Sequence, residues 1–115
     1  MPMFDPKSII FSHIQASAGY VARYAEAWPP DRITEAVELA LEQEDPDIAD
    51  RARRGLERRL VNIRKALDLA ERHANVDELS PVEELEAASA DMAEAYALYR
   101  NALIDIGLVQ SPTRP

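Results

Sequence analysis

Basic side chains are concentrated between residues 51 and 65, and their spacing suggests binding chemistry. This stretch contains one acid, Glu57, and seven cations: Arg51, Arg53, Arg54, Arg58, Arg59, Arg64 and Lys65. Segment 46–74 has a net charge of +3 and the rest of the chain has −11, so the protein is electrically divided. If the segment is helical, five cations share the face opposite its apolar positions: Arg51, Arg54, Arg58, Lys65 and Arg72. A row of guanidinium and ammonium groups binds carboxylates or phosphates.

Three interpretations of these cations stay open. They can bind an acidic protein surface, or they can bind nucleic-acid phosphates, although a net charge of −8 opposes approach to DNA. They can also be neutralised within the chain, by acids four residues before an arginine or by acids of a neighbouring helix. The first set of acids gives the pairs Asp47 with Arg51, Asp50 with Arg54, and Asp68 with Arg72, and the second set is Glu35, Glu38 and Glu42.

The chain contains two histidines, His13 and His73. Neither follows a glutamate by three residues, so the Glu-x-x-His motif of di-iron bundles is absent. The stretch from His13 to Gly19 resembles the histidine motif of histidine phosphotransfer domains, without the lysine and glycine that follow the histidine there. The resemblance implies a helical bundle with His13 as the phosphate acceptor, which is the weakest of our functional alternatives.

The other polar residues do not form a catalytic pattern. The acids of segments 42–50 and 83–86 flank expected helix starts, where capping and the helix dipole account for carboxylates. The chain has no cysteine, and no serine stands in a Gly-x-Ser-x-Gly turn. We therefore expect a protein that is not an enzyme and that binds no metal and no cofactor.

Composition indicates a folded helical protein. The chain has 115 residues, of which 47% are hydrophobic, 30% are charged and only three are glycine. We expect one domain over residues 1–110 and a disordered tail over residues 111–115. The absence of cysteine, of a recognisable signal peptide and of a long apolar run predicts a soluble cytoplasmic protein without a membrane span.

Prolines divide the chain into four expected helices. They cover about residues 6–28, 32–44, 46–74 and 81–106. Asp5, Asp31 and Asp45 are the expected N-caps of the first three, Ser80 with Glu83 forms a capping box for the fourth, and Gly107 ends it. The apolar positions predicted to face the core include Leu56, Ile63 and Leu67 in the third helix and Leu85, Met92 and Tyr99 in the fourth. The sequence thus predicts an all-α antiparallel helical bundle with three long helices and one short helix.

The unequal lengths of these helices bear on assembly. The three long helices measure about 35 to 43 Å and the second about 20 Å, which excludes an evenly filled four-helix bundle. Either three helices form the core, or the second helix pairs with the start of the third and a hairpin of the last two projects. The second arrangement would leave Ile63, Leu67, Leu85 and Met92 to be covered by another chain. A stripe on the last helix, Ala90, Ala93, Ala97 and Ile104, also offers a surface for close helix packing.

These observations favour a noncatalytic protein–protein interaction module, acting as an adaptor, inhibitor or assembly subunit. We expect it to form a homodimer and to bind a further protein partner. The alternative is a nucleic-acid-binding bundle that uses the basic residues of the third helix.

Overall fold

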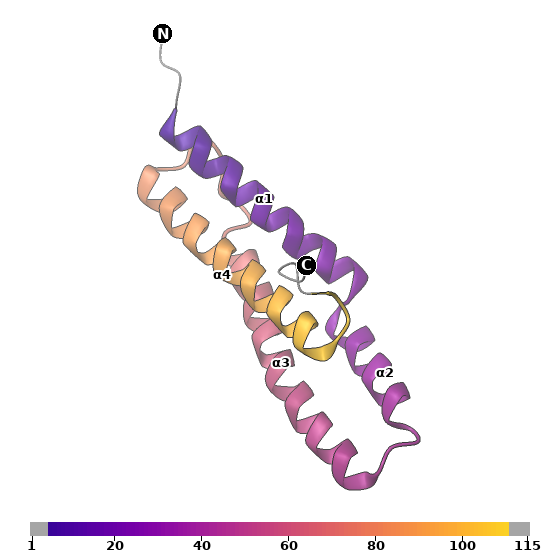
Figure 1. The fold of residues 1–115 in the computed structure, drawn as a ribbon. Helices are drawn as coiled ribbons and strands as arrows, with labels where there is room; N and C mark the ends of the chain where they lie inside the picture. The colour runs from indigo at the N-terminus through magenta and orange to yellow at the C-terminus, as the bar shows by residue number, and fades with distance from the viewer. Residues whose placement is uncertain (1–4, 111–115) are drawn as a thin grey trace.

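The computed structural model describes residues 5–110 and shows four α-helices (Figure 1). They are α1 (Pro6–Ala27), α2 (Pro30–Leu41), α3 (Pro46–Arg72) and α4 (Val82–Ile106), and the described part of the chain contains no strand. The all-α bundle with three long helices and one short helix is therefore confirmed. The expected tail at residues 111–115 lies outside the described residues.

Local signals for helix ends are confirmed at three places. The Asp5 carboxylate accepts a hydrogen bond from the Lys7 N–H at 3.1 Å, and the Asp45 carboxylate accepts one from the Asp47 N–H at 2.9 Å. Each aspartate precedes a proline in the first turn, which suits a helix start because proline fixes φ and has no N–H to satisfy. At the end of α4, Gly107 adopts a left-handed conformation with φ 94°, and its N–H donates to the Leu103 carbonyl.

Two predicted caps are wrong. Helix α2 begins at Pro30, so Pro29 is the N-cap and Asp31 lies within the first turn. The Ser80 hydroxyl does not cap α4 but accepts a hydrogen bond from the Asp77 N–H at 3.1 Å, and the Ser80 N–H donates to the Asp77 carbonyl. The hydroxyl and the N–H of Ser80, which the expected capping box needed, are thus both used by the turn that precedes α4. Pro81 is the N-cap instead.

Helix α4 packs along both α1 and α3, whereas α2 packs on the first half of α3 (Figure 1). Tyr20 contacts Tyr96 and Tyr24 contacts Tyr99, so α1 and α4 run parallel. Helix α3 is antiparallel to its neighbours α2 and α4, as expected for helices joined by short turns. Helix α2 continues beyond the end of α1, so α1 and α2 together form one side of an elongated bundle.

The core has two parts. The larger cluster joins α3 and α4 to the end of α1 and to α2, and the smaller one joins the beginnings of α1 and α4. Tyr99 is fully buried in the larger cluster, and its hydroxyl donates to the Trp28 carbonyl at 2.7 Å, which fastens α4 to the corner between α1 and α2. The predicted core positions Leu56, Ile63, Leu85, Met92 and Tyr99 are buried. Ala66 and Leu69 are also buried, although the predicted seam of α3 omitted them.

The two arrangements considered from the sequence are both partly realised. Helix α2 does pair with the start of α3, but α3 and α4 do not project as a bare hairpin, because α1 lies against α4. The expectation that this pairing leaves four residues for a second chain to cover is wrong. Ile63, Leu85 and Met92 are buried within this chain, and Leu67 is half-buried.

The molecule is elongated, with extents of 65 × 33 × 19 Å. Its radius of gyration is 17.3 Å. A compact chain of this length would have about 13 Å. Since an α-helix with side chains is about 10 Å wide, the short dimension holds about two helices. Each of the long helices therefore keeps one face toward solvent.

Candidate functional site

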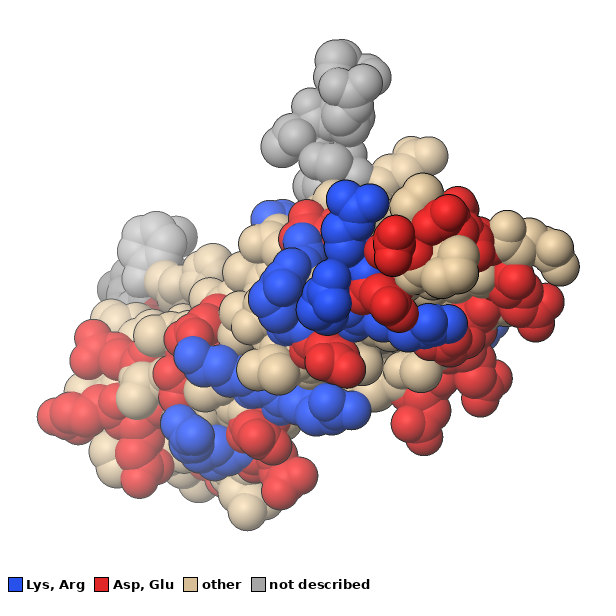
Figure 2. All heavy atoms as spheres, turned by 90° about the horizontal axis from the view of Figure 1, so that it is seen from below, with Lys and Arg blue, Asp and Glu red and all other residues tan. Residues whose placement is uncertain are grey.

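The five cations predicted to share one side of α3, Arg51, Arg54, Arg58, Lys65 and Arg72, are all exposed and are called the basic face here. Helix α3 holds them there because its opposite side, with Leu56, Leu60 and Ile63, is buried against α2 and α4. Figure 2 shows Lys and Arg side chains gathered across the middle of the view, with Asp and Glu side chains both beside them and among them.

Acids of α4 neutralise one end of the basic face. The Lys65 Nζ lies 3.1 Å from the Glu94 carboxylate, and Arg72 Nη1 lies 4.0 Å from the Asp91 carboxylate. Within residues 5–110, Arg51, Arg54 and Arg58 have no carboxylate at ion-pair distance. The face is thus divided into a free N-terminal part and a paired C-terminal part.

The pairing of acids with arginines four residues later, which one interpretation of the sequence offered, is absent for all three pairs in the described chain. Asp50 lies 3.6 Å from Arg53 Nη1 rather than near Arg54, and Arg72 turns toward Asp91 of α4. Asp47 lies in the first turn of α3 and forms no ion pair with Arg51. Ion pairs four residues apart on an exposed helix contribute little, about 0.2–0.5 kcal/mol, so tertiary partners redirect them easily.

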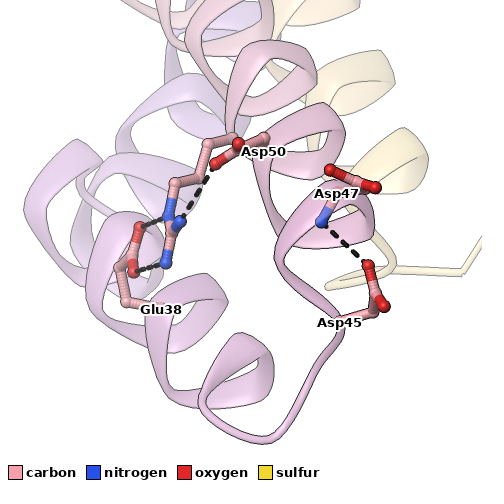
Figure 3. A network of polar contacts seen from close by, with 5 residues as sticks. Glu38, Asp45, Asp47 and Asp50 are labelled. Atoms are coloured by element: carbon pink, nitrogen blue, oxygen red, sulfur yellow. Dashed lines mark hydrogen bonds and ion pairs between the residues drawn. The ribbon is translucent and has the colours of Figure 1, made fainter.

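Helix α2 does supply an acid to α3, as the sequence suggested. Two nitrogens of Arg53 donate to the two oxygens of Glu38 at 2.8 and 2.9 Å (Figure 3). The hydrogen bonds from Arg53 lower the pKa of Glu38, and those to Glu38 raise the pKa of Arg53. Arg53 does not belong to the basic face, so this contact holds α2 in place without neutralising Arg51, Arg54 or Arg58.

The basic face also has an apolar centre. Val61 is 63% exposed and lies between Arg58 and Lys65 along the helix, three and four residues away from them. Arg54, Arg58, Val61 and Lys65 thus follow one side of α3 over about 16 Å. Cations around an exposed apolar side chain fit a surface that combines carboxylates with an apolar residue.

The structure brings together one pair that sequence analysis missed. His73 Nε2 lies 2.6 Å from Asp91 Oδ2, and the His73 side chain is only 14% exposed. His73 also borders a cleft of about 330 Å³ whose lining is Arg72, His73, Asn75, Val76, Glu84 and Ala87. An aspartate can orient a histidine for proton transfer, but the lining includes no Ser, Thr, Cys or Lys that the histidine could activate. The pair therefore joins the C-cap of α3 to α4, and its separation by 18 residues left no local signal.

The other candidates from the sequence lie elsewhere. His13 is exposed on α1, and Ala90 and Ala93 are exposed on α4, where Ala97 and Ile104 are half-buried. In residues 5–110, no three His, Cys, Asp or Glu side chains are grouped closely enough to hold a metal ion. No helix in that same range is long and apolar enough to cross a membrane.

The fold and these surfaces define an all-α bundle with an exposed basic face. Comparisons with protein family models, with curated proteins and with solved structures found no match.

Proposed function

We propose that this protein is a noncatalytic interaction module that binds an acidic protein surface through the basic face of α3. The observation that supports this most is the state of Arg51, Arg54 and Arg58. They are exposed on successive turns of one helix and form no ion pair in the described chain, although the protein has 21 acids. Like charges four residues apart, such as Arg54 and Arg58, destabilise a helix slightly. Their presence on one side of α3 is explained if they bind an acidic partner.

A protein partner fits this surface better than a nucleic acid. Glu94 and Asp91 neutralise the C-terminal part of the basic face, so the row of free cations is short. The net charge of −8 repels a phosphate backbone at long range. Val61 at the centre of the face gives apolar contact area, which protein interfaces use and phosphates do not. The test must therefore distinguish binding of a protein from binding of a nucleic acid by the same residues.

We also propose that the module forms a homodimer through the stripe Ala90, Ala93, Ala97 and Ile104. Helical periodicity places these residues away from the buried Leu85, Met92 and Tyr99 of α4; Ala90 and Ala93 are exposed, and Ala97 and Ile104 are half-buried. Small side chains let two helices approach closely.

We further propose that the protein acts in the cytoplasm, because a chain without cysteine suits this reducing compartment.

The test is a charge reversal with a matched control. The probe is a fluorescein-labelled helical peptide of about 20 residues built from Glu and Leu, titrated in fluorescence anisotropy. Replacing Arg54→Glu and Arg58→Glu together should weaken binding at least about tenfold, since both groups are expected to contact carboxylates. The control, Lys7→Glu with Arg23→Glu on α1, makes the same change in net charge and should leave the affinity within about twofold.

Two results would overturn the proposal. Equal weakening in both variants would mean that net charge alone governs the interaction. Retention of a labelled DNA duplex at physiological salt, lost in the α3 variant and kept in the α1 variant, would establish the nucleic-acid alternative instead. Circular dichroism of both variants checks that the helices are intact.

A further inference from the structure

Two opposite charges of α4 have no ionic partner in the described chain. Arg100 Nη2 donates only to the neutral Asn101 side chain at 3.3 Å, and Arg100 Nε is buried without any hydrogen-bond partner. The Arg100 guanidinium is held over the Tyr96 ring, 5.4 Å from its centroid. Glu86 is exposed and forms no ion pair with any residue in the range 5–110. The two residues are separated by about 21 Å along the helix, so they cannot pair within one molecule.

These charges belong to a face on which two pairs of residues are spaced symmetrically about Ala93. We call it the outer face of α4, and its residues are Val82, Glu86, Ala90, Ala93, Ala97, Arg100 and Ile104. Glu86 and Arg100 lie seven residues to either side of Ala93, and Val82 and Ile104 lie eleven residues to either side. The opposite side of α4, with Leu85, Met92 and Tyr99, is buried against α1 and α3.

We infer that a second copy of this chain packs its α4 antiparallel on the outer face, with the two-fold axis at Ala93. This inference rests on the self-association in the proposed function and specifies its register. In this register Glu86 lies opposite Arg100 of the partner subunit, and the symmetry produces this ion pair twice. Val82, which is 38% exposed, lies opposite Ile104 of the partner subunit at each end.

Side-chain size and spacing support this geometry. Alanines at and beside the axis let the helices approach to about 8 Å. At this distance the longer side chains that lie seven and eleven residues from Ala93 can reach those of the partner helix. From Glu86 to Ile104 the steps alternate between four and three residues, as in a heptad, which keeps one side of each helix on the contact when the helices cross at a shallow angle. Charge complementarity selects the antiparallel orientation, because a parallel pair would place like charges opposite each other.

A cross-linking experiment tests the register. The protein contains no cysteine, so Ala93→Cys introduces a single thiol per chain, and the proposed axis places the two thiols of a dimer together. Under mild oxidation this variant should form a covalent dimer at least about tenfold faster than Val61→Cys, whose thiol would be exposed on α3. Equal rates for the two variants would overturn the register.

A charge exchange gives an independent readout. Glu86→Arg alone and Arg100→Glu alone each place like charges opposite one another, so each should weaken the dimer at least about tenfold in sedimentation equilibrium. The double variant Glu86→Arg with Arg100→Glu restores opposite charges and should recover the wild-type dissociation constant. A stable dimer without this rescue and without fast cross-linking would overturn the register and leave self-association standing. A monomeric mass at all concentrations would overturn both.

Discussion

At the residue scale, Tyr99 shows how one polar group supports the fold. The Tyr99 ring is fully buried and its hydroxyl donates to the Trp28 carbonyl at 2.7 Å, so the chain turns from α1 to α2 at a fixed point on α4. Burial raises the pKa of Tyr99 to about 12. Burial also raises the pKa of Tyr24, which lies beside it.

Replacing Tyr99→Phe should lower the free energy of unfolding at pH 7 by about 1 kcal/mol, because the Trp28 carbonyl loses its donor. A raised pKa in the folded state means that the stabilisation is complete below the unfolded pKa of about 10 and is lost as pH rises toward 12. Urea unfolding at pH 7 and pH 11 should therefore show a larger loss of stability for wild type than for Tyr99→Phe. Equal losses would mean that Tyr99 does not carry the alkaline sensitivity.

The residue scale also shows what local sequence can predict. The caps Asp5 and Asp45 were predictable because each aspartate accepts a hydrogen bond from a backbone N–H only two residues later. Ser80 was not, because the turn at Asp77 and the helix at Glu83 compete for the same hydroxyl. The contact between His73 and Asp91 depends on how α3 and α4 are placed, which no local pattern specifies.

At the element scale, the helices were predictable and their pairing was only partly so. Prolines and apolar spacing locate each helix, since both act along the chain. That five cations of α3 share one exposed side follows from helical periodicity. Which cations of the helix pair with Glu94, Asp91 or Asp105 depends on the rotation of α3 against α4, which is decided by packing in the core.

Two glycines in different conformations give a matched pair of stability predictions. Gly55→Ala should raise the free energy of unfolding by about 0.5–1 kcal/mol, because Gly55 lies inside α3 and helical alanine loses less backbone entropy. A Cβ there would lie 3.6 Å from the Arg59 side chain, an ordinary contact distance. Gly107→Ala should instead destabilise the protein by about 1 kcal/mol, because Gly107 has φ 94°. Urea unfolding checks both, and destabilisation by Gly55→Ala would contradict the described helix.

At the scale of the whole molecule, elongation and charge division produce two separate outward surfaces. The extents of 65 × 33 × 19 Å leave one side of each long helix uncovered. The basic face lies on α3 and the outer face lies on α4, so the proposed partner and the proposed second copy use different helices. A dimer would carry two basic faces, and a partner with two acidic segments would bind it more tightly than a monomer.

The most direct test of the proposed function is to map the residues at which an acidic ligand binds. The Glu and Leu peptide is titrated into ¹⁵N-labelled protein, and shifts of backbone amides and of arginine Nε–H signals are followed by NMR. We predict that the largest changes fall within residues 51–65, with the side-chain signals of Arg54 and Arg58 among them, and that α1 changes little. Changes centred on another helix, or no changes at low salt, would contradict a binding role for the basic face.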